Sequence, residues 1–446
     1  MCAIFGVIYA GGTYSFIDTK QPEKRITQIL KILKPTIIIT DLENRNNIIS
    51  IAQTVGSKLK NIEDILEKSE SINIDEIRIN EKRLSIIDTQ PLYINFTSGS
   101  TGSPKGVVVS HRSVMDFIPQ FVEVMKITKD DKIGNQAPFD FDVSVKDIYS
   151  AIYTGATVVL IPREYFSKPV CLMDYLCDRK ISILIWAVSA LCFITTMKGL
   201  EYRCPTEIKC IGFSGEVMPI KHFNKLKKYL TKTKFINLYG PTEITCNCTY
   251  YSIPEEVTYS LQDTIPIGKN FVNEKVFLLD ENDNLINPKN RSLIGEICVA
   301  GTCLALGYYN DEERTNKVFV QNPLQDKYRE IIYRTGDMAQ YVADGNLRYI
   351  SRKDFQVKHL GHRIELGEIE SITMQIDNVD RAICMYQLEK KRIVLFYTGK
   401  CEKKTIQEIL HESLPTYMIP NKIIKLEMMP LNKNGKIDRN VIKELM

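Results

Sequence analysis

Apolar, β-prone runs alternate with amphipathic helical stretches through the first part of the chain. Short apolar runs at residues 36–40, 92–96, 156–161, 181–185 and 235–238 are strand candidates. In the stretch 142–153 between them, helical spacing places Val145, Ile148, Tyr149 and Ile152 on one face, and Ser144 with Asp147 forms a possible capping pair. This alternation predicts an α/β protein with helices packed on largely parallel sheets.

The pattern changes after roughly residue 260, where the strands become shorter. Asp344-Gly345 predicts a hairpin turn between strands at 338–342 and 346–351. From Phe355 to Met446 the pattern indicates a small α+β unit. Single hydrophobic cores stop growing near ~250–300 residues. We therefore expect a large α/β domain over residues 1–353 and a small C-terminal α+β lid over 354–446.

Composition excludes several functional classes. Hydrophobic residues make up 44% and charged residues 25% of the chain, as in ordinary globular proteins. The net charge of +4 is too small to indicate a nucleic-acid or membrane partner. The twelve cysteines do not follow zinc-site spacings, so we expect free thiols in a reducing, cytoplasmic environment. The start lacks the basic region of a signal peptide, and the apolar stretch 181–197 is better read as a buried strand entering a helix.

A Gly-, Ser- and Thr-rich loop between two strand-like runs carries the strongest chemical signal. Its members are Thr97, Ser98, Gly99, Ser100, Thr101 and Gly102, followed by Lys105 and Gly106. Hydroxyls and bare backbone N–H groups can wrap a polyphosphate, and Lys105 adds a point charge. The spacing is not that of a Walker A loop. The alternative for the loop alone is a flexible surface linker.

Further motifs follow in a fixed order along the chain. They are Phe139–Lys146, Ser214-Gly215-Glu216, Asn237-Leu238-Tyr239-Gly240-Pro241-Thr242-Glu243, Tyr333–Asp337, Ser351–Lys358, Gly361–Glu370 and Asn434–Arg439. Together with the loop, they resemble the adenylate-forming (ANL) superfamily: acyl-CoA synthetases, luciferases and nonribosomal-peptide adenylation domains. The segment 4–18 looks like an early core motif, which in that family follows several dozen further residues. The resemblance therefore implies an N-terminally shortened large domain.

The resemblance implies a nucleotide site. Tyr239, on the turn made by Gly240, would stack on adenine, while Gly215 and Glu216 would line its other side. Asp337 would accept hydrogen bonds from both ribose hydroxyls. Thr242 would bind the α-phosphate and Glu243 would hold Mg²⁺, which prefers carboxylate oxygen. The remaining expected contacts to ATP come from Asn237, Arg352 and the phosphate loop.

The resemblance also implies a catalytic lysine and a hinge. Lys436 would neutralise charge as a carboxylate attacks the α-phosphate of ATP. Lys105 and Thr242 would assist in this step, and Asp354 would be the pivot of the C-terminal domain. Leu360 and Leu306 replace basic residues that are common in the family. Both departures affect surfaces that face a carrier or change conformation, so they concern the partner and not the nucleotide site.

The residue at the position of Asp142 differs between branches of this family. In amino-acid-activating members, an aspartate at this position binds the substrate α-ammonium, although Asp142 could also merely precede a helix cap. The walls implied by resemblance are Val143, Lys146, Ile185, Ile211, Phe213, Leu238, Cys246 and Asn247. Most are apolar and Phe213 takes up depth, which predicts a small or medium uncharged side chain. We expect Lys146 to lie at the rim with its ammonium in water; if it points inward, the substrate should carry an acid.

The implied activity is ATP-dependent formation of an aminoacyl-AMP, followed by transfer to the phosphopantetheine thiol of a separate carrier protein. The sequence looks most like stand-alone adenylation domains and D-alanine:carrier protein ligases. One alternative is a carboxylate–CoA ligase of the same fold, which Asp142 disfavours. Another is an inactive homologue that binds nucleotide, which Lys105, Glu243, Asp337 and Lys436 disfavour.

Overall fold

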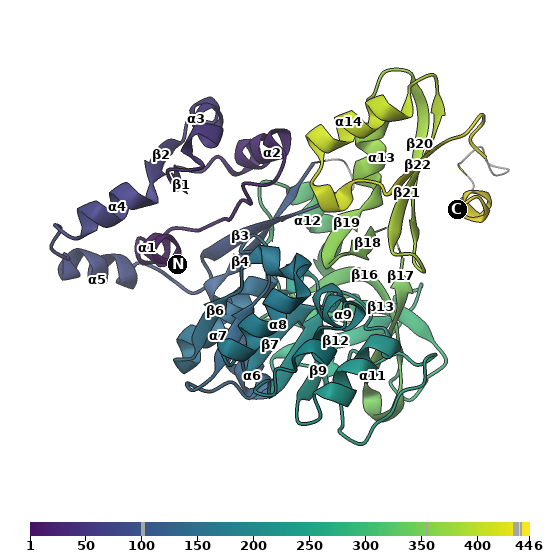
Figure 1. Cartoon of the computed structure of the whole chain (residues 1–446), viewed down its shortest axis with the longest axis horizontal. Coiled ribbons are helices and arrows are strands. Elements are labelled where there is room, and N and C mark those ends of the chain that lie inside the picture. The colour runs from purple at the N-terminus through teal and green to yellow at the C-terminus, as the bar shows by residue number, and fades with distance from the viewer. Residues whose placement is uncertain (100–102, 354–355, 431–436, 438) are drawn as a thin grey trace. The chain divides into compact units, whose positions relative to one another are not determined.

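The computed structural model describes residues 1–99, 103–353, 356–430, 437 and 439–446, and it divides into two compact units. The first unit contains residues 1–86, 96–106 and 355–446, and the second contains 87–95 and 107–354. Each unit mixes helices and sheets, which confirms the predicted α/β class. The grouping of the first 86 residues with the C-terminal ones is not visible in the sequence. Figure 1 labels many of the elements of both units.

A seven-stranded sheet forms the centre of the second unit, in the order β11-β10-β9-β8-β7-β5-β6. Strands β5 to β9 pair in parallel, whereas β10 and β11 are antiparallel. The strand predictions at 156–161, 181–185 and 235–238 are confirmed. The elements of this layer are β5 (Lys132–Asn135), β6 (Thr157–Leu160), β7 (Ile183–Ala187), β8 (Cys210–Ser214), β9 (Lys234–Tyr239), β10 (Thr249–Ser252), β11 (Lys269–Asn270), α6 (His111–Met125), α7 (Val143–Thr154), η1 (Arg163–Ser167), α8 (Pro169–Asp178), α9 (Val188–Thr196), α10 (Gly199–Tyr202), α11 (Ile220–Tyr229) and η2 (Thr242–Ile244).

Helices cover both faces of this sheet, as the parallel strand order requires. One face packs with α8, α9 and α11 into a core that includes Leu184, Trp186, Phe213 and Phe235. The opposite face meets α6, because a Cβ atom added at Gly212 would lie 3.0 Å from the Sδ atom of Met125. Helix α7 packs against α6 and against β5, β6 and β7. Each strand therefore has two apolar faces that contact different helices.

Two further sheets contain the remaining strands of the second unit. One has the order β12-β13-β16-β15 with β17 paired to β16, and the other is β14-β4-β3. The predicted hairpin is confirmed, since Tyr341 pairs with Leu347 and both Asp344 and Gly345 have positive φ. The elements are β3 (Pro91–Thr97), β4 (Lys105–Ser110), β12 (Glu274–Leu279), β13 (Ile294–Gly301), β14 (Gly307–Tyr308), α12 (Glu312–Val318), β15 (Phe319–Gln321), β16 (Ile331–Tyr341), η3 (Ala343–Gly345) and β17 (Leu347–Arg352).

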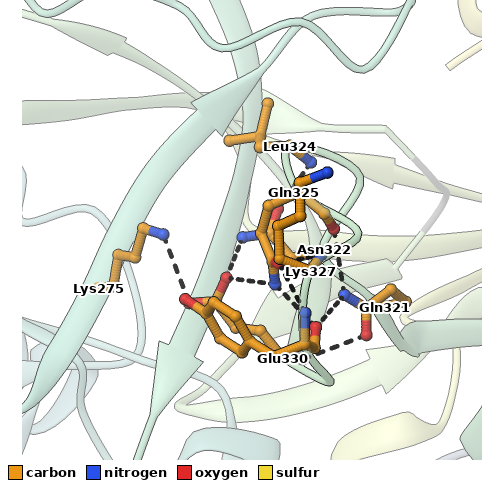
Figure 2. Close-up of polar contacts among 8 residues, drawn as sticks. Lys275, Gln321, Asn322, Leu324, Gln325, Lys327 and Glu330 are labelled. Carbon is orange, nitrogen blue, oxygen red and sulfur yellow. Dashed lines mark hydrogen bonds and ion pairs between the residues drawn. The ribbon is translucent and has the colours of Figure 1, made fainter.

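The loop from β15 to β16 is held by side-chain amides and one carboxylate (Figure 2). Glu330 accepts a hydrogen bond from Asn322 at 2.6 Å and lies 3.4 Å from the ammonium of Lys275. The side chain of Gln325 donates to the carbonyl of Tyr328 at 3.0 Å. The bond from Asn322 is the main cause that lowers the pKa of Glu330 below its usual value. The loop is thus fixed by local polar contacts and contributes none of the predicted site residues.

The first unit contains an N-terminal helical part and a C-terminal α+β part. In the C-terminal part, β20, β21 and β22 form a sheet packed on α13 and α14, with Leu395 and Ile406 in its core. The elements of the unit are α1 (Cys2–Tyr9), α2 (Glu23–Leu33), β1 (Ile37–Thr40), α3 (Arg45–Thr54), β2 (Lys58–Asn61), α4 (Ile62–Ser69), α5 (Glu76–Leu84), β18 (Gln356–His359), β19 (His362–Glu365), α13 (Leu366–Met374), β20 (Val379–Gln387), β21 (Arg392–Gly399), α14 (Lys403–Ser413), η4 (Thr416–Met418), β22 (Lys422–Lys425) and α15 (Arg439–Glu444).

All twelve cysteines are free thiols. In the described ranges, no helix is both long enough and apolar enough to cross a membrane. The stretch 181–197 instead forms strand β7 followed by helix α9, as its composition predicted.

Candidate functional site

A buried hydrogen-bonded group in the second unit joins three of the predicted nucleotide residues. The hydroxyl of Tyr239, at the end of β9, donates to Oδ2 of Asp337 on β16 at 2.6 Å. Oδ1 of the same carboxylate accepts from the guanidinium of Arg352, at the end of β17, at 2.8 Å. Burial and the adjacent carboxylate raise the pKa of Tyr239 well above its usual value. The structure therefore brings the expected adenine platform and the expected ribose acceptor into direct contact.

The turn after Tyr239 requires glycine. A Cβ atom at Gly240 would lie 2.5 Å from the Cα of Asn247, so the two backbone segments can approach only because a side chain is absent. Thr242 and Glu243 follow in η2, and both are buried. Oε1 of Glu243 accepts a hydrogen bond from the Tyr308 hydroxyl at 2.7 Å. A single oriented carboxylate beside Thr242 fits Mg²⁺, which usually takes one or two protein carboxylates together with substrate phosphates.

The other predicted nucleotide residues of the second unit have separate surroundings. Gly215 has φ +94°, a conformation that favours glycine, and Glu216 follows it with a partly exposed side chain. The side-chain amide of Asn237 donates to the carbonyl of Pro266 at 2.8 Å. That bond anchors the segment before β11, so Asn237 has a structural partner in addition to its predicted role.

The phosphate loop belongs to the first unit, where its described groups contact carboxylates near β19. The hydroxyl of Ser98 donates to the carbonyl of Arg363 at 2.8 Å, and the backbone N–H of Gly99 donates to Oε2 of Glu368 at 3.1 Å. Nζ of Lys105 lies 3.6 Å from Oε1 of Glu365. The cationic and N–H groups that the sequence assigned to phosphate thus bind acidic side chains here. Ser100, Thr101, Gly102, the predicted hinge Asp354 and the predicted catalytic Lys436 lie outside the described residues.

Glu368 is the buried centre of this group. Arg25, on α2, pairs with its Oε1, and both side chains are almost completely buried. Burial raises the pKa of Glu368, and the neighbouring Arg25 guanidinium opposes that shift. An Arg–carboxylate pair with an additional backbone donor satisfies most of the lone pairs of a buried carboxylate. Residues from the N-terminal helical part therefore hold the carboxylate that binds Gly99.

Helix α7 places Asp142 and Lys146 one turn apart in the second unit. Asp142 is the N-cap residue, and its carbonyl accepts a contact from Sγ of Cys246 at 3.2 Å. Lys146 is 0% exposed, so the prediction that it lies at the rim is wrong. Its Nζ donates to Oδ1 of Asn247 at 2.7 Å and lies 5.8 Å from the centre of the Phe121 ring. The reason is that α7 is covered by α6 on this side, so water does not reach the lysine stem.

The predicted helix cap and apolar face are also corrected. Ser144 donates its hydroxyl to the carbonyl of Phe141 at 2.8 Å and does not cap the helix, and Ile152 is exposed. Asp147 is fully buried and accepts from the Asn135 amide at 2.7 Å. Burial raises the pKa of Asp147 to about 7, whereas Asn135 and Lys146 act in the opposite direction. Polar residues of α7 therefore form an interior cluster that its hydrophobic pattern does not predict.

Strand register divides the predicted pocket walls between two faces of the sheet. Ile185 pairs with Gly212, and Gly212 pairs with Ile236. Leu238 lies two residues after Ile236 on β9, so its side chain lies on the same face of the sheet as that of Ile185. Ile211 and Phe213 point the other way and pack with Trp186 in the core beneath α8, α9 and α11. The prediction that Ile211 and Phe213 line the same pocket as Ile185 and Leu238 is therefore wrong, because these two side chains lie on the other face of the sheet. Gly212 and Ser214 occupy those positions instead.

The remaining predicted walls stay together. Val143, Cys246 and Asn247 are buried beside Asp142 and Lys146, on the side covered by α6 and α7. Gly212, Ser214, Tyr308 and Arg25 were missed by sequence reasoning. The alternation of side chains along β8 could have identified Gly212 and Ser214, because Ile185 and Leu238 already define the face of the sheet that lines the pocket. The sequence contains no comparable signal for Tyr308 or Arg25.

Comparison with known proteins shows the family. The model of the AMP-binding enzyme family matches residues 1–309, and the chain belongs to that family. Bacitracin synthase 1 of Bacillus licheniformis is 35% identical over 452 aligned residues, which cover 99% of this chain. The chain spans only 8% of the length of that relative. The resemblance to nonribosomal-peptide-type adenylation domains is confirmed at this level.

Two solved structures share the fold. The adenylation domain AlmE of Vibrio cholerae, solved with glycyl-adenosine-5'-phosphate, superposes with a TM-score of 0.83 at 21% identity. The alignment covers 99% of this chain and 86% of AlmE. Holo-PA1221, which contains adenylation and PCP domains, gives a TM-score of 0.76 at 23% identity, covering 99% of this chain and 73% of that one. This chain therefore shares the fold of these two proteins.

Proposed function

We propose that this protein activates an amino acid with ATP and passes it to a carrier protein. The α-carboxylate would attack the α-phosphorus of ATP, forming an aminoacyl-AMP and releasing pyrophosphate. The aminoacyl group would then move to the phosphopantetheine thiol of a carrier protein, and AMP would leave. This function is supported by AlmE, which was solved with an aminoacyl adenylate, and by PA1221, which joins adenylation and PCP domains.

The observation that carries the proposal is the position of Asp142. Its carboxylate belongs to a largely buried residue at the start of α7, beside Cys246 and one turn before Lys146. A carboxylate removed from water binds an ammonium through a charge-assisted hydrogen bond, which fatty or aryl acids cannot supply. Asp142 therefore favours amino acids over the carboxylic acids used by CoA ligases.

The same proposal assigns roles to the nucleotide residues. Tyr239 and Asp337 would hold adenine and ribose, with Arg352 orienting the Asp337 carboxylate. Thr242 would bind the α-phosphate, and Lys105 with the rest of the 97–106 loop would bind the departing phosphates. Lys436 would offset the charge that develops when two anions meet. Mg²⁺ held by Glu243 would supply Lewis-acid stabilisation of the phosphates.

Pyrophosphate exchange into ATP tests the proposal. The purified chain should exchange labelled pyrophosphate in the presence of at least one amino acid and not with acetate, fatty acids or benzoates. The Asp142→Asn variant should lose exchange by about 30- to 1000-fold, because an ammonium loses a buried charged partner. Exchange driven only by simple carboxylic acids, and unaffected in Asp142→Asn, would contradict amino-acid activation. Transfer is then checked by mass spectrometry of holo-carrier proteins incubated with enzyme, ATP and the active amino acid.

A further inference from the structure

Lys146 is a fully buried cation with few hydrogen bonds. Its ammonium has three N–H donors, and within the described parts of the chain it donates only to Oδ1 of Asn247. Phe121 provides a ring face at 5.8 Å but no acceptor oxygen. A buried ammonium that lacks an anionic partner is costly. Burial accordingly lowers the pKa of Lys146, although Cys246, Asp142 and Asp147 act in the opposite direction.

Asn247 completes a donor pair beside this lysine. Its carbonyl oxygen accepts from Lys146, so its Nδ2 group lies on the other side of the amide. Among the described residues, that Nδ2 group donates to no acceptor, and Asn247 is only 1% exposed. An ammonium and an amide NH₂ next to each other match the two oxygens of a carboxylate.

The negative groups nearby do not supply the missing anion. The carboxyl of Asp147 is bound by Asn135, and its Oδ1 has no hydrogen-bond partner in the described structure, so it does not bond to Lys146. With a pKa of about 7, Asp147 is protonated in a large fraction of molecules at neutral pH. Asp142 is required by the proposed function for the substrate α-ammonium. When that ammonium is bound, Lys146 is left without a counter-charge.

The spacing of Asp142 and Lys146 limits the length of the ligand. Residues i and i+4 lie on the same face of a helix, about 6 Å apart along its axis. The α-ammonium and side-chain carboxylate of aspartate or glutamate are separated by a comparable distance. An amino acid of this kind would place its ammonium on Asp142 and its distal acid on Lys146 and Asn247.

We propose that the natural substrate is an α-amino acid with a short side chain ending in a carboxylate, held by Lys146 and Asn247 while Asp142 holds the α-ammonium. This inference rests on the proposed amino-acid activation and specifies its substrate class. It replaces the sequence-based expectation of an uncharged side chain. That expectation depended on Phe213, which packs on the opposite face of the sheet.

The test compares acids with their matched amides in pyrophosphate exchange. For the wild type, kcat/KM for glutamate or aspartate should exceed that for glutamine or asparagine by at least about 30-fold, the range for a buried charge pair. Lys146→Met should remove most of this ratio, and Lys146→Arg should restore part of it. Lys227→Met is the matched control, because this lysine binds the backbone carbonyls of Glu255 and Val257 and should leave the ratio unchanged.

The outcomes separate this inference from the proposed function. Highest activity with an uncharged or basic amino acid, in a ranking that Lys146→Met does not alter, would overturn the acidic substrate and leave amino-acid activation intact. Exchange with simple acids but with no amino acid would overturn both. If Lys146→Met does not fold, as judged by circular dichroism, the wild-type ratio of acid to amide and the Asn247→Ala variant still decide. Asn247→Ala should lower the ratio, since one of the two donors to the carboxylate is lost.

Discussion

The Tyr239 hydroxyl and Oδ2 of Asp337 are 2.6 Å apart, although the residues are 98 positions apart in the chain. They lie at the end of β9 and within β16, in different sheets of the second unit. The contact orients one carboxylate oxygen, while Arg352 holds the other. A carboxylate fixed at both oxygens has a defined direction in which to accept further hydrogen bonds, which is a requirement for recognising a pair of ribose hydroxyls.

Asp337→Asn should therefore weaken AMP binding by about 10- to 100-fold, the scale for losing hydrogen bonds to a charged group. Isothermal titration with AMP, 2′-deoxy-AMP and 3′-deoxy-AMP measures the effect. Removing a ribose hydroxyl should weaken binding to the wild type much more than to Asp337→Asn. Asp283→Asn is the control, since Asp283 pairs with Arg334 and not with the predicted nucleotide residues. Equal penalties for the deoxynucleotides in wild type and variant would show that Asp337 does not bind the ribose.

Glu365→Gln should strengthen the binding of pyrophosphate or ATP by a few fold. The Glu365 carboxylate lies 3.6 Å from the Lys105 ammonium, so it competes with phosphate for the same cation. The gain should be modest because the contact, at 3.6 Å, is longer than a direct charge-assisted hydrogen bond. Apparent KM values for ATP and pyrophosphate in the exchange reaction provide the measurement, with Glu370→Gln as control because Glu370 pairs with Arg439. Weaker nucleotide binding by Glu365→Gln would mean that Glu365 supports the loop instead of competing with its ligand.

Asp147→Asn should alter how stability depends on pH. The folded pKa of Asp147, about 7, lies above its ordinary value of 3.8. The folded state therefore binds this proton more tightly, so the stabilising contribution is complete below pH 3.8 and is lost as pH rises through 7. Urea unfolding at pH 5, 6, 7 and 8 should show wild-type stability falling relative to Asp147→Asn across this range. A constant difference would show that Asp147 does not titrate there.

Much of the fold could be predicted, because turn residues and short apolar runs mark the strands of β7 and β9 clearly. The position of Lys146 could not. Its neighbour Val145 is buried and Ile152 is exposed, so the helical pattern alone misjudged which side α6 covers. The register of β8 was lost for a related reason. A parallel strand with helices on both faces can be apolar on both sides, so the alternation of Ile211 and Phe213 with Gly212 and Ser214 shows which face lines the pocket only when it is combined with the positions of Ile185 and Leu238.

Lys436→Ala should slow formation of the aminoacyl-AMP by roughly 10²–10³, the scale for removing one preorganised charge-stabilising donor. Transfer from pre-formed aminoacyl-AMP to the carrier should change little, if the lysine acts only in the first half-reaction. Single-turnover assays of each half-reaction give the two rates separately. Lys443→Ala, on the exposed side of α15, is the matched control. An equal loss in both half-reactions would indicate a structural role for Lys436.

The two faces of β8 can be distinguished by substitution. Gly212→Val should raise the KM for the amino acid, because even a Cβ atom there would lie 3.0 Å from Cδ1 of Leu238 and from Sδ of Met125, on the side of Lys146. Phe213→Leu should instead lower the free energy of unfolding by about 1–3 kcal/mol, since it removes packing in the core around Trp186. It should leave the ranking of amino acids unchanged. Exchange assays across an amino-acid panel, combined with urea unfolding of both variants, measure these effects. A changed ranking in Phe213→Leu with no effect of Gly212→Val would restore the register that the sequence suggested.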